Sequence, residues 1–237
     1  MRINKYIAGY LGVSRRQADS LIEKGEILYN GVPAEVGNKV AEKDKVCYKK
    51  DNRWVLITPN TARTSLHYKP IFTLVSTKSE GNKKTIYERL SPRYRSFKPA
   101  GRLDYMSEGL LVLSEDGDLI HELTHPRHDT RKKYVVGLTV PLQYTHLNKL
   151  CKGVTIDNYR LRPVRITPLD AKTLDSWAYL RLDPRQYWYE FTLQEGRNNQ
   201  IRKMCRLFDY KITRLIRTAH GPYTLTPELK KNKIIDL

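Results

Sequence analysis

An apolar run at residues 109–113, Gly-Leu-Leu-Val-Leu, restricts the fold of this chain more than any other stretch. A short apolar run between polar residues is typical of a buried β-strand. Asp104 precedes this strand on a predicted loop, beside Arg102, in a chain that is otherwise strongly basic. Because Asp is a favoured turn residue, an isolated Asp at this point would be assigned to a solvated turn. The other motifs of the chain decide whether Asp104 has a second role.

The net charge limits the class of partner. Lys and Arg number 43 against 25 Asp and Glu, which gives a formal charge of +18 spread along the chain. Such an excess suits an anionic polymer, either nucleic acid or an acidic membrane surface. The longest aliphatic run, residues 110–113, is far shorter than the ~20 residues of a spanning helix. The N-terminus also lacks a signal-peptide core or lipidation motif. We therefore expect a nucleic acid partner and no membrane partner.

The length of the chain and its cysteines limit the number of domains and the cellular compartment. A chain of 237 residues favours two domains over one. Cys47, Cys151 and Cys205 are far apart and form neither a zinc pattern nor a disulfide framework. Their spacing indicates structural thiols in a reducing compartment, which predicts a cytoplasmic protein.

The first sixty residues predict a small helical module. The apolar spacing within residues 4–11 predicts a short helix. Ser-Arg-Arg-Gln at residues 14–17 has the form of a capping box and predicts a second helix that stops at Gly25. Asn30 and Gly31 then stand between two strand-like runs, which is a strong hairpin signal.

This order of elements resembles the S4 RNA-binding domain over about residues 1–58. That family presents its helix pair to RNA, whereas without the resemblance the basic residues would be a solvated, charged helix end. Phosphate contacts of this kind fix orientation without reading sequence. The resemblance implies such contacts for Arg2, Lys5, Arg15, Arg16 and Lys24.

A linker-like stretch within residues 51–65 places the domain boundary near residue 62, between an S4-like domain at 1–60 and a second domain at 63–237. Strand-like runs with a few helices follow, which favours an α+β fold with a mixed, largely antiparallel sheet. The predicted strands lie within 67–77, 109–115, 132–140, 160–169, 178–183 and 187–195, and the predicted helices lie near 84–90, 118–124, 142–151 and 198–208.

His-Glu-Leu-Thr-His at residues 121–125 matches the H-E-x-x-H pattern of zinc hydrolases. Pro126 follows at once and disfavours helical geometry at His125, so convergence of the two imidazoles is not assured. A third ligand at a family-like distance is missing, because His128 comes three residues later with no predicted helix between. We therefore interpret His121 and His125 as helix-end and turn residues and assign no metal.

A long motif at residues 101–117, GRLDYMSEGLLVLSEDG, resembles the RsuA/RluB branch of RNA pseudouridine synthases, with Ser107 in place of the usual Thr. Further matching stretches follow the family's order at residues 66–70, 131–138 and 195–225. The resemblance implies conversion of uridine to pseudouridine in RNA, in which the N1–C1′ bond breaks, the base rotates and C5 bonds to C1′. This chemistry needs a carboxylate but no metal or cofactor. The resemblance assigns that carboxylate to Asp104.

The same resemblance assigns further site residues. Arg202, one turn from Arg206 on a predicted helix, takes the position of the salt-bridge partner of the catalytic Asp, and Tyr134 takes that of the active-site Tyr. Tyr134 offers a ring that stacks on uracil and a phenol that accepts the C5 proton, although a Tyr in a strand is usually packing. The supporting pocket residues are Arg102, Leu103, Lys133 and Leu215.

The resemblance implies ribosomal RNA or a pre-ribosomal particle as partner of a monomer, and Thr-His-Pro-Arg at residues 124–127 favours the large subunit. The target nucleotide must be extruded from its stack into the pocket. Whether Asp104 attacks C1′, adds to C6 or abstracts the C2′ proton stays open. The alternatives are a noncatalytic S4-type RNA-binding or ribosome-assembly protein and an H-E-x-x-H zinc hydrolase.

Overall fold

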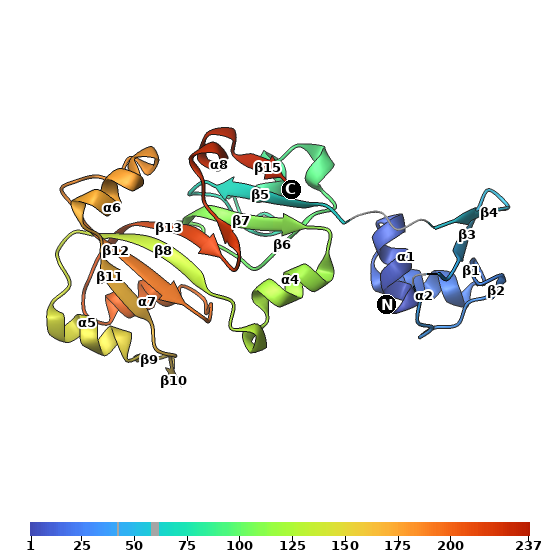
Figure 1. The fold of residues 1–237 in the computed structure, drawn as a ribbon, viewed down its shortest axis with the longest axis horizontal. Helices are drawn as coiled ribbons and strands as arrows, with labels where there is room; N and C mark the ends of the chain where they lie inside the picture. Colours follow the sequence, from blue (N-terminus) through green and yellow to red (C-terminus); the bar gives the residue numbers. More distant parts are fainter. Residues whose placement is uncertain (42, 58–61) are drawn as a thin grey trace. The chain divides into compact units, whose positions relative to one another are not determined.

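A computed structural model describes residues 1–41, 43–57 and 62–237. The chain divides into two compact units, Met1–Ala62 and Arg63–Leu237 (Figure 1). The predicted linker falls partly on residues 58–61, outside the described residues. No helix among the described residues is both long and apolar enough to cross a bilayer.

The N-terminal unit contains the predicted helix pair and hairpin. Ser14 and Gln17 form the predicted capping box, with the Gln17 amide donating to the Ser14 hydroxyl. Asn30 and Gly31 both adopt positive φ, 51° and 87°, as a two-residue hairpin turn requires. The elements are α1 (Ile3–Leu11), α2 (Arg15–Glu23), β1 (Ile27–Tyr29), β2 (Val32–Pro33), β3 (Val46–Lys50) and β4 (Arg53–Leu56), with strand order β2-β1-β3-β4.

The second unit is built on a mixed, mostly antiparallel sheet with the order β11-β12-β8-β13-β7-β5-β15. A separate hairpin pairs β9 (Thr155–Ile156) with β10 (Tyr159–Arg160). The α+β prediction is confirmed. The sheet strands are β5 (Thr64–Lys69), β6 (Lys98–Pro99), β7 (Glu108–Ser114), β8 (Lys132–Leu138), β11 (Arg165–Pro168), β12 (Tyr187–Leu193), β13 (Ile212–His220), β14 (Tyr223–Thr224) and β15 (Ile234–Asp236).

Helices cover both faces of this sheet. Along β8, Val136 belongs to the apolar cluster that includes residues of α5 (Tyr144–Cys151) and α7 (Gln200–Arg206). Val135 belongs to the cluster that includes residues of α4 (Gly117–Thr124), η3 (Ala178–Leu180) and α8 (Pro227–Asn232). Alternate residues of the strand thus face opposite cores. The helices are α3 (Ile86–Arg89), α4 (Gly117–Thr124), α5 (Tyr144–Cys151), α6 (Ala171–Ser176), α7 (Gln200–Arg206) and α8 (Pro227–Asn232), with 3₁₀ turns η1 (Pro92–Tyr94), η2 (Pro126–His128) and η3 (Ala178–Leu180).

Two predicted strands are wrong in whole or in part, and one strand was missed. The predicted strand at 178–183 is the 3₁₀ turn η3, because Leu180 turns into the core below α8. The predicted strand at 67–77 ends at Lys69, since Pro70 lacks the amide proton that a ladder needs. The central strand β13 was not predicted, because Arg214 and Arg217 interrupt its apolar residues and only residues 207–211 separate it from α7.

The parallel contact between β7 and β13 is unusually close. Gly109 lies opposite Arg217 with a φ of +110°, and an added Cβ would lie 2.3 Å from the Arg217 carbonyl oxygen. The two strands can therefore approach this closely only because Gly109 has no side chain.

We expect Gly109→Ala to destabilise the second unit by at least about 2 kcal/mol, because it adds both a backbone clash and an unfavourable φ. Gly117→Ala is the matched control, since a Cβ at Gly117 meets no atom of the described residues within 4 Å and its φ is ordinary. Urea unfolding monitored by circular dichroism compares the two. Equal unfolding midpoints for both variants would contradict the role given to Gly109.

Candidate active site

A cavity of about 300 Å³ opens where the loop before β7 meets β8 and β13. It brings together Asp104, Tyr134 and Leu215 from separate parts of the chain, as the sequence predicted for one pocket. Arg102 and Leu103 line it as well. The remaining lining residues are Gly101, Ser107, Thr124, Pro126, Lys132, Tyr159, Arg162, Leu193, Gln194, Glu195, Gly196, Arg197, Gln200, Ile201 and Arg217.

The loop that carries Asp104 is held by backbone contacts. The Ser107 amide donates to the Asp104 carbonyl (3.0 Å), and the Phe72 amide donates to the Tyr105 carbonyl (2.8 Å). The Lys69 ammonium, fully buried beneath the loop, donates to the Ser107 carbonyl at 2.7 Å. These bonds fix the loop from below and leave the half-buried Asp104 side chain facing the cavity.

Lys69 lies in the matching stretch at residues 66–70, but the sequence did not indicate its role at the site. Burial lowers the pKa of the Lys69 ammonium to about 7, and the negative charge of Asp104 opposes that shift. Arg217 lowers it further. The charges of Lys69 and Asp104 therefore interact across the loop without direct contact.

Arg202 contacts the loop that carries Asp104, but through backbone and hydroxyl groups and not through the Asp104 carboxylate. Its guanidinium donates to the Met106 carbonyl (2.9 Å) and to Ser107 Oγ (3.5 Å). Within residues 1–41, 43–57 and 62–237, Asp104 and Arg202 form no ion pair, which corrects the predicted salt bridge. The reason is local, because the turn before β7 directs the Met106 carbonyl toward α7. Burial lowers the pKa of Arg202, and the charge of Asp104 opposes this effect.

Arg217 of β13 is the cation that the sequence did not indicate. It is 1% exposed, and its Nε donates to the Leu110 carbonyl at 2.8 Å while Nη1 lies 3.4 Å from the Arg102 carbonyl. Its Nη2 is buried and has no hydrogen-bond partner among the residues that the structure describes. Because β13 was not predicted, the side of the strand on which Arg217 lies was not predictable either.

The alternation of β8 decides which Lys belongs to the pocket. Tyr134 is half buried, lies opposite Arg217 in the ladder and lines the cavity together with Lys132. Lys133 points to the other face, where it pairs with Glu190 at 3.2 Å. The prediction of Lys133 as a pocket residue is therefore wrong, since side chains alternate along a strand. Burial lowers the pKa of the Lys132 ammonium to about 8, and Arg217 contributes.

Basic residues surround the mouth of the cavity. Arg162 pairs with Asp129, and the Arg197 guanidinium lies 3.1 Å from the ring centre of Tyr159. Arg162 and Arg197 are exposed and line the cavity. Arg197 lies in the matching stretch at residues 195–225 but was not assigned a role, and the only signal for Arg162 was the general basic charge. A pocket with a cationic rim suits a substrate that carries phosphates.

The predicted RNA contacts of the N-terminal unit lie on its helix pair. Arg15 and Arg16 begin α2, Arg2 caps α1, and all three are exposed, as is Lys24 at the end of α2. Lys5 on α1 is half buried. The positions agree with a charged helix surface of this unit.

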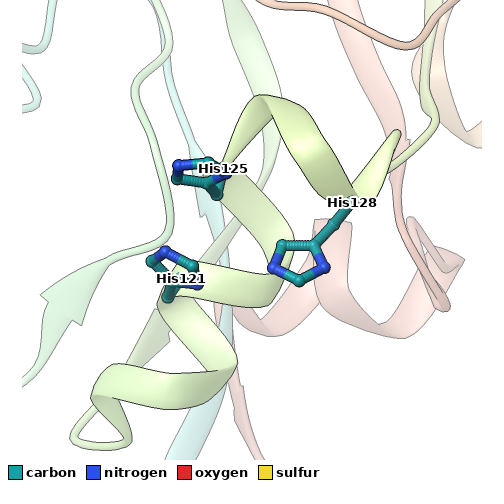
Figure 2. A group of neighbouring side chains, drawn as sticks. All are labelled: His121, His125 and His128. Carbon is teal, nitrogen blue, oxygen red and sulfur yellow. The ribbon is translucent and has the colours of Figure 1, made fainter.

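The histidine motif adopts an arrangement that the sequence did not predict. Helix α4 ends at Thr124 and His125 is extended, with φ −73° and ψ 132°, as expected before Pro126. The 3₁₀ turn η2 nevertheless returns His128 toward His121 and His125, and the three imidazoles converge (Figure 2). The interpretation of His121 and His125 as helix-end and turn residues therefore omits their proximity to His128.

Comparison with protein families identifies both units. Residues 63–207 match the RNA pseudouridylate synthase family, and residues 1–46 match the S4 domain. A solved pseudouridylate synthase shares the fold, with a TM-score of 0.65 and 24% identity over 100% of this chain and 96% of that one.

Curated relatives extend the match along the chain. It is 32% identical to the dual-specificity RNA pseudouridine synthase RluF of Salmonella typhi, over 92% of this chain and 69% of that protein. It is 26% identical to the ribosomal large subunit pseudouridine synthase B of Yersinia pestis, over 97% of this chain and 70% of that protein. The chain therefore belongs to the RNA pseudouridine synthases of the RluB, RluF and RsuA family, with an S4 domain at its N-terminus.

Proposed function

We propose that this enzyme isomerises a uridine of ribosomal RNA in the cavity beside β7, with Asp104 as the reacting carboxylate. The observation that carries the proposal is the convergence of Asp104, Tyr134 and Leu215 on one cavity from three separate stretches. Its volume of about 300 Å³ lies at the lower end of the ~300–1,000 Å³ typical of ligand pockets. A single extruded nucleotide is a substrate of suitable size.

Asp104 acts as the nucleophile or base that allows the N1–C1′ bond to break. The three routes, attack on C1′, addition to C6 and abstraction of the C2′ proton, all need a carboxylate held at one place. The contacts of Lys69 with the Ser107 carbonyl and of Arg202 with the Met106 carbonyl hold the loop, so both act as positioning residues.

Tyr134 and Leu215 form the walls that hold the uracil ring. The base stays bound while it rotates, so that C5 reaches C1′ and the C5 proton leaves. Tyr134 supplies an aromatic face for stacking, and its phenolate oxygen takes this proton to give the neutral phenol. No metal or cofactor takes part in these steps.

The S4 unit and the relatives support ribosomal RNA as the substrate. We favour large-subunit RNA, free or in a pre-ribosomal particle, because one relative is named for the large subunit. We further propose a cytoplasmic monomer. The family match argues against both a noncatalytic RNA-binding protein and a zinc hydrolase.

We expect Asp104→Asn to abolish pseudouridine formation while RNA affinity and folding hold, because the amide keeps the size of the side chain and removes its charge. Tritium release from C5-labelled RNA measures turnover, and filter binding measures affinity. Asp175→Asn is the control, since Asp175 is an exposed carboxylate of α6 outside the cavity. Retained turnover in Asp104→Asn would remove Asp104 from the chemistry.

We expect Tyr134→Phe to lower the single-turnover rate ~10²–10⁴-fold, the loss of a general base, with nearly unchanged RNA affinity. The ring remains for stacking, so the variant isolates the phenolic oxygen. Tyr187→Phe is the matched control, because Tyr187 is exposed on β12 and does not line the cavity. A Tyr134→Phe rate within about threefold of wild type would reduce Tyr134 to a stacking surface.

We expect the double variant Arg15→Gln, Arg16→Gln to bind RNA more weakly and with a shallower salt dependence. Each lost phosphate contact removes about 0.9 from the log–log slope on duplex and about 0.7 on single strands. Lys49→Gln, Lys50→Gln removes the same charge from exposed positions of β3 in the same unit. An identical slope for the two double variants would show that the start of α2 does not contact RNA.

A further inference from the structure

Three histidines from one short segment gather their rings on the surface of the second unit (Figure 2). His121 lies in α4, His125 follows its last residue, and His128 ends the 3₁₀ turn η2. The rings of His121 and His125 stack with centres 4.6 Å apart, and the His128 ring stands edge-on to both, at 5.3 and 5.9 Å. The pocket chemistry proposed above uses none of these side chains.

The spacing of the ring nitrogens suits one small cation. One nitrogen from each ring can be chosen so that all three lie within 4.8 Å of one another. Tetrahedral Zn²⁺ with Zn–N bonds of ~2.0–2.1 Å needs ligand nitrogens about 3.3 Å apart. Small side-chain rotations close this difference, because His121 and His128 are exposed.

The backbone beneath the rings is held in place before any ion binds. The buried His220 donates through Nε2 to the Leu123 carbonyl at 2.9 Å, and the Thr130 hydroxyl donates to the Glu122 carbonyl at 2.8 Å. Both bonds satisfy carbonyls at the end of α4. The three imidazoles therefore extend from a fixed turn, which reduces the ordering cost of binding a ligand.

One hydrogen bond must be exchanged on binding. The Arg127 amide donates to His125 Nδ1 at 3.2 Å, a bond that an ion held by His125 would disrupt. Because this bond is long and exposed, water replaces it at little cost.

We propose that His121, His125 and His128 form a binding site for one divalent transition-metal ion of the Zn²⁺ type, with water completing its coordination. Imidazole nitrogen is a preferred ligand of such ions, and an exposed three-histidine site keeps an open position. Thr124 and Pro126, which lie between the ligands in sequence, line the uridine cavity. The ion would thus stiffen one wall of the cavity without entering its chemistry.

The test is titration of the intact chain, without a polyhistidine tag, with Zn²⁺ alone by isothermal calorimetry. We expect one ion per chain, and at least about tenfold weaker binding in His121→Asn and in His128→Asn, since loss of a ligand costs no less than loss of a supporting contact. Arg127→Gln is the matched control, because it lies between two of the ligands and removes no imidazole. It should retain binding.

A second measurement separates this site from other zinc-binding groups of the chain. Zn²⁺ should raise the thermal unfolding midpoint of wild type and of Arg127→Gln, and it should not raise that of His121→Asn or His128→Asn. Equal affinity in wild type and His121→Asn, or no saturable binding to wild type, would overturn the proposal. Neither result depends on the role of Asp104.

Discussion

The parallel contact between β7 and β13 is the constraint on which the active site depends. Gly109 has no side chain, so the Arg217 backbone lies where a Cβ would otherwise stand. This approach places the Arg217 guanidinium beneath the backbone of Arg102 and against the Leu110 carbonyl. Because the loop with Asp104 leads directly into β7, its position follows from the same contact. A small change in strand spacing would therefore move the carboxylate, the buried guanidinium and the Tyr134 wall relative to one another.

A buried polar network secures the start of β7. Burial alone would raise the pKa of the Glu108 carboxyl, but hydrogen bonds from Arg214 and Tyr68 lower it below its usual range. Arg214 Nε donates to Glu108 Oε1 at 2.6 Å, and the Lys230 ammonium lies 3.7 Å from Oε2. Glu108 thus connects β7 with β5, β13 and α8 through ionised or hydrogen-bonded groups. Removal of one partner would leave a buried charge unpaired, which is costly, so this network and the close strand contact support each other.

The sequence predicted elements that neighbouring residues determine, such as helix caps and turns. It did not predict which side chains of each strand face the cavity. The capping box at Ser14, the hairpin at Asn30 and the strand after Asp104 were predictable, because neighbouring residues determine them. The prediction of Lys133 as a pocket residue was wrong, because Lys133 and Tyr134 are neighbours on one strand and their side chains point to opposite faces.

The partner of Arg202 and the grouping of the three histidines were not predicted, for a related reason. Sequence spacing indicates which residues come near one another, but the backbone between them decides which atoms meet. The Met106 carbonyl accepts a hydrogen bond from the Arg202 guanidinium, which was expected to pair with Asp104. Pro126 ends α4, as its effect on His125 predicted, yet a proline is also well suited to begin a 3₁₀ turn. That turn brings His128 back to His121. Pro126 therefore disfavours the helical zinc motif and at the same time begins the turn that groups His121, His125 and His128. Helical spacing rules do not describe this grouping.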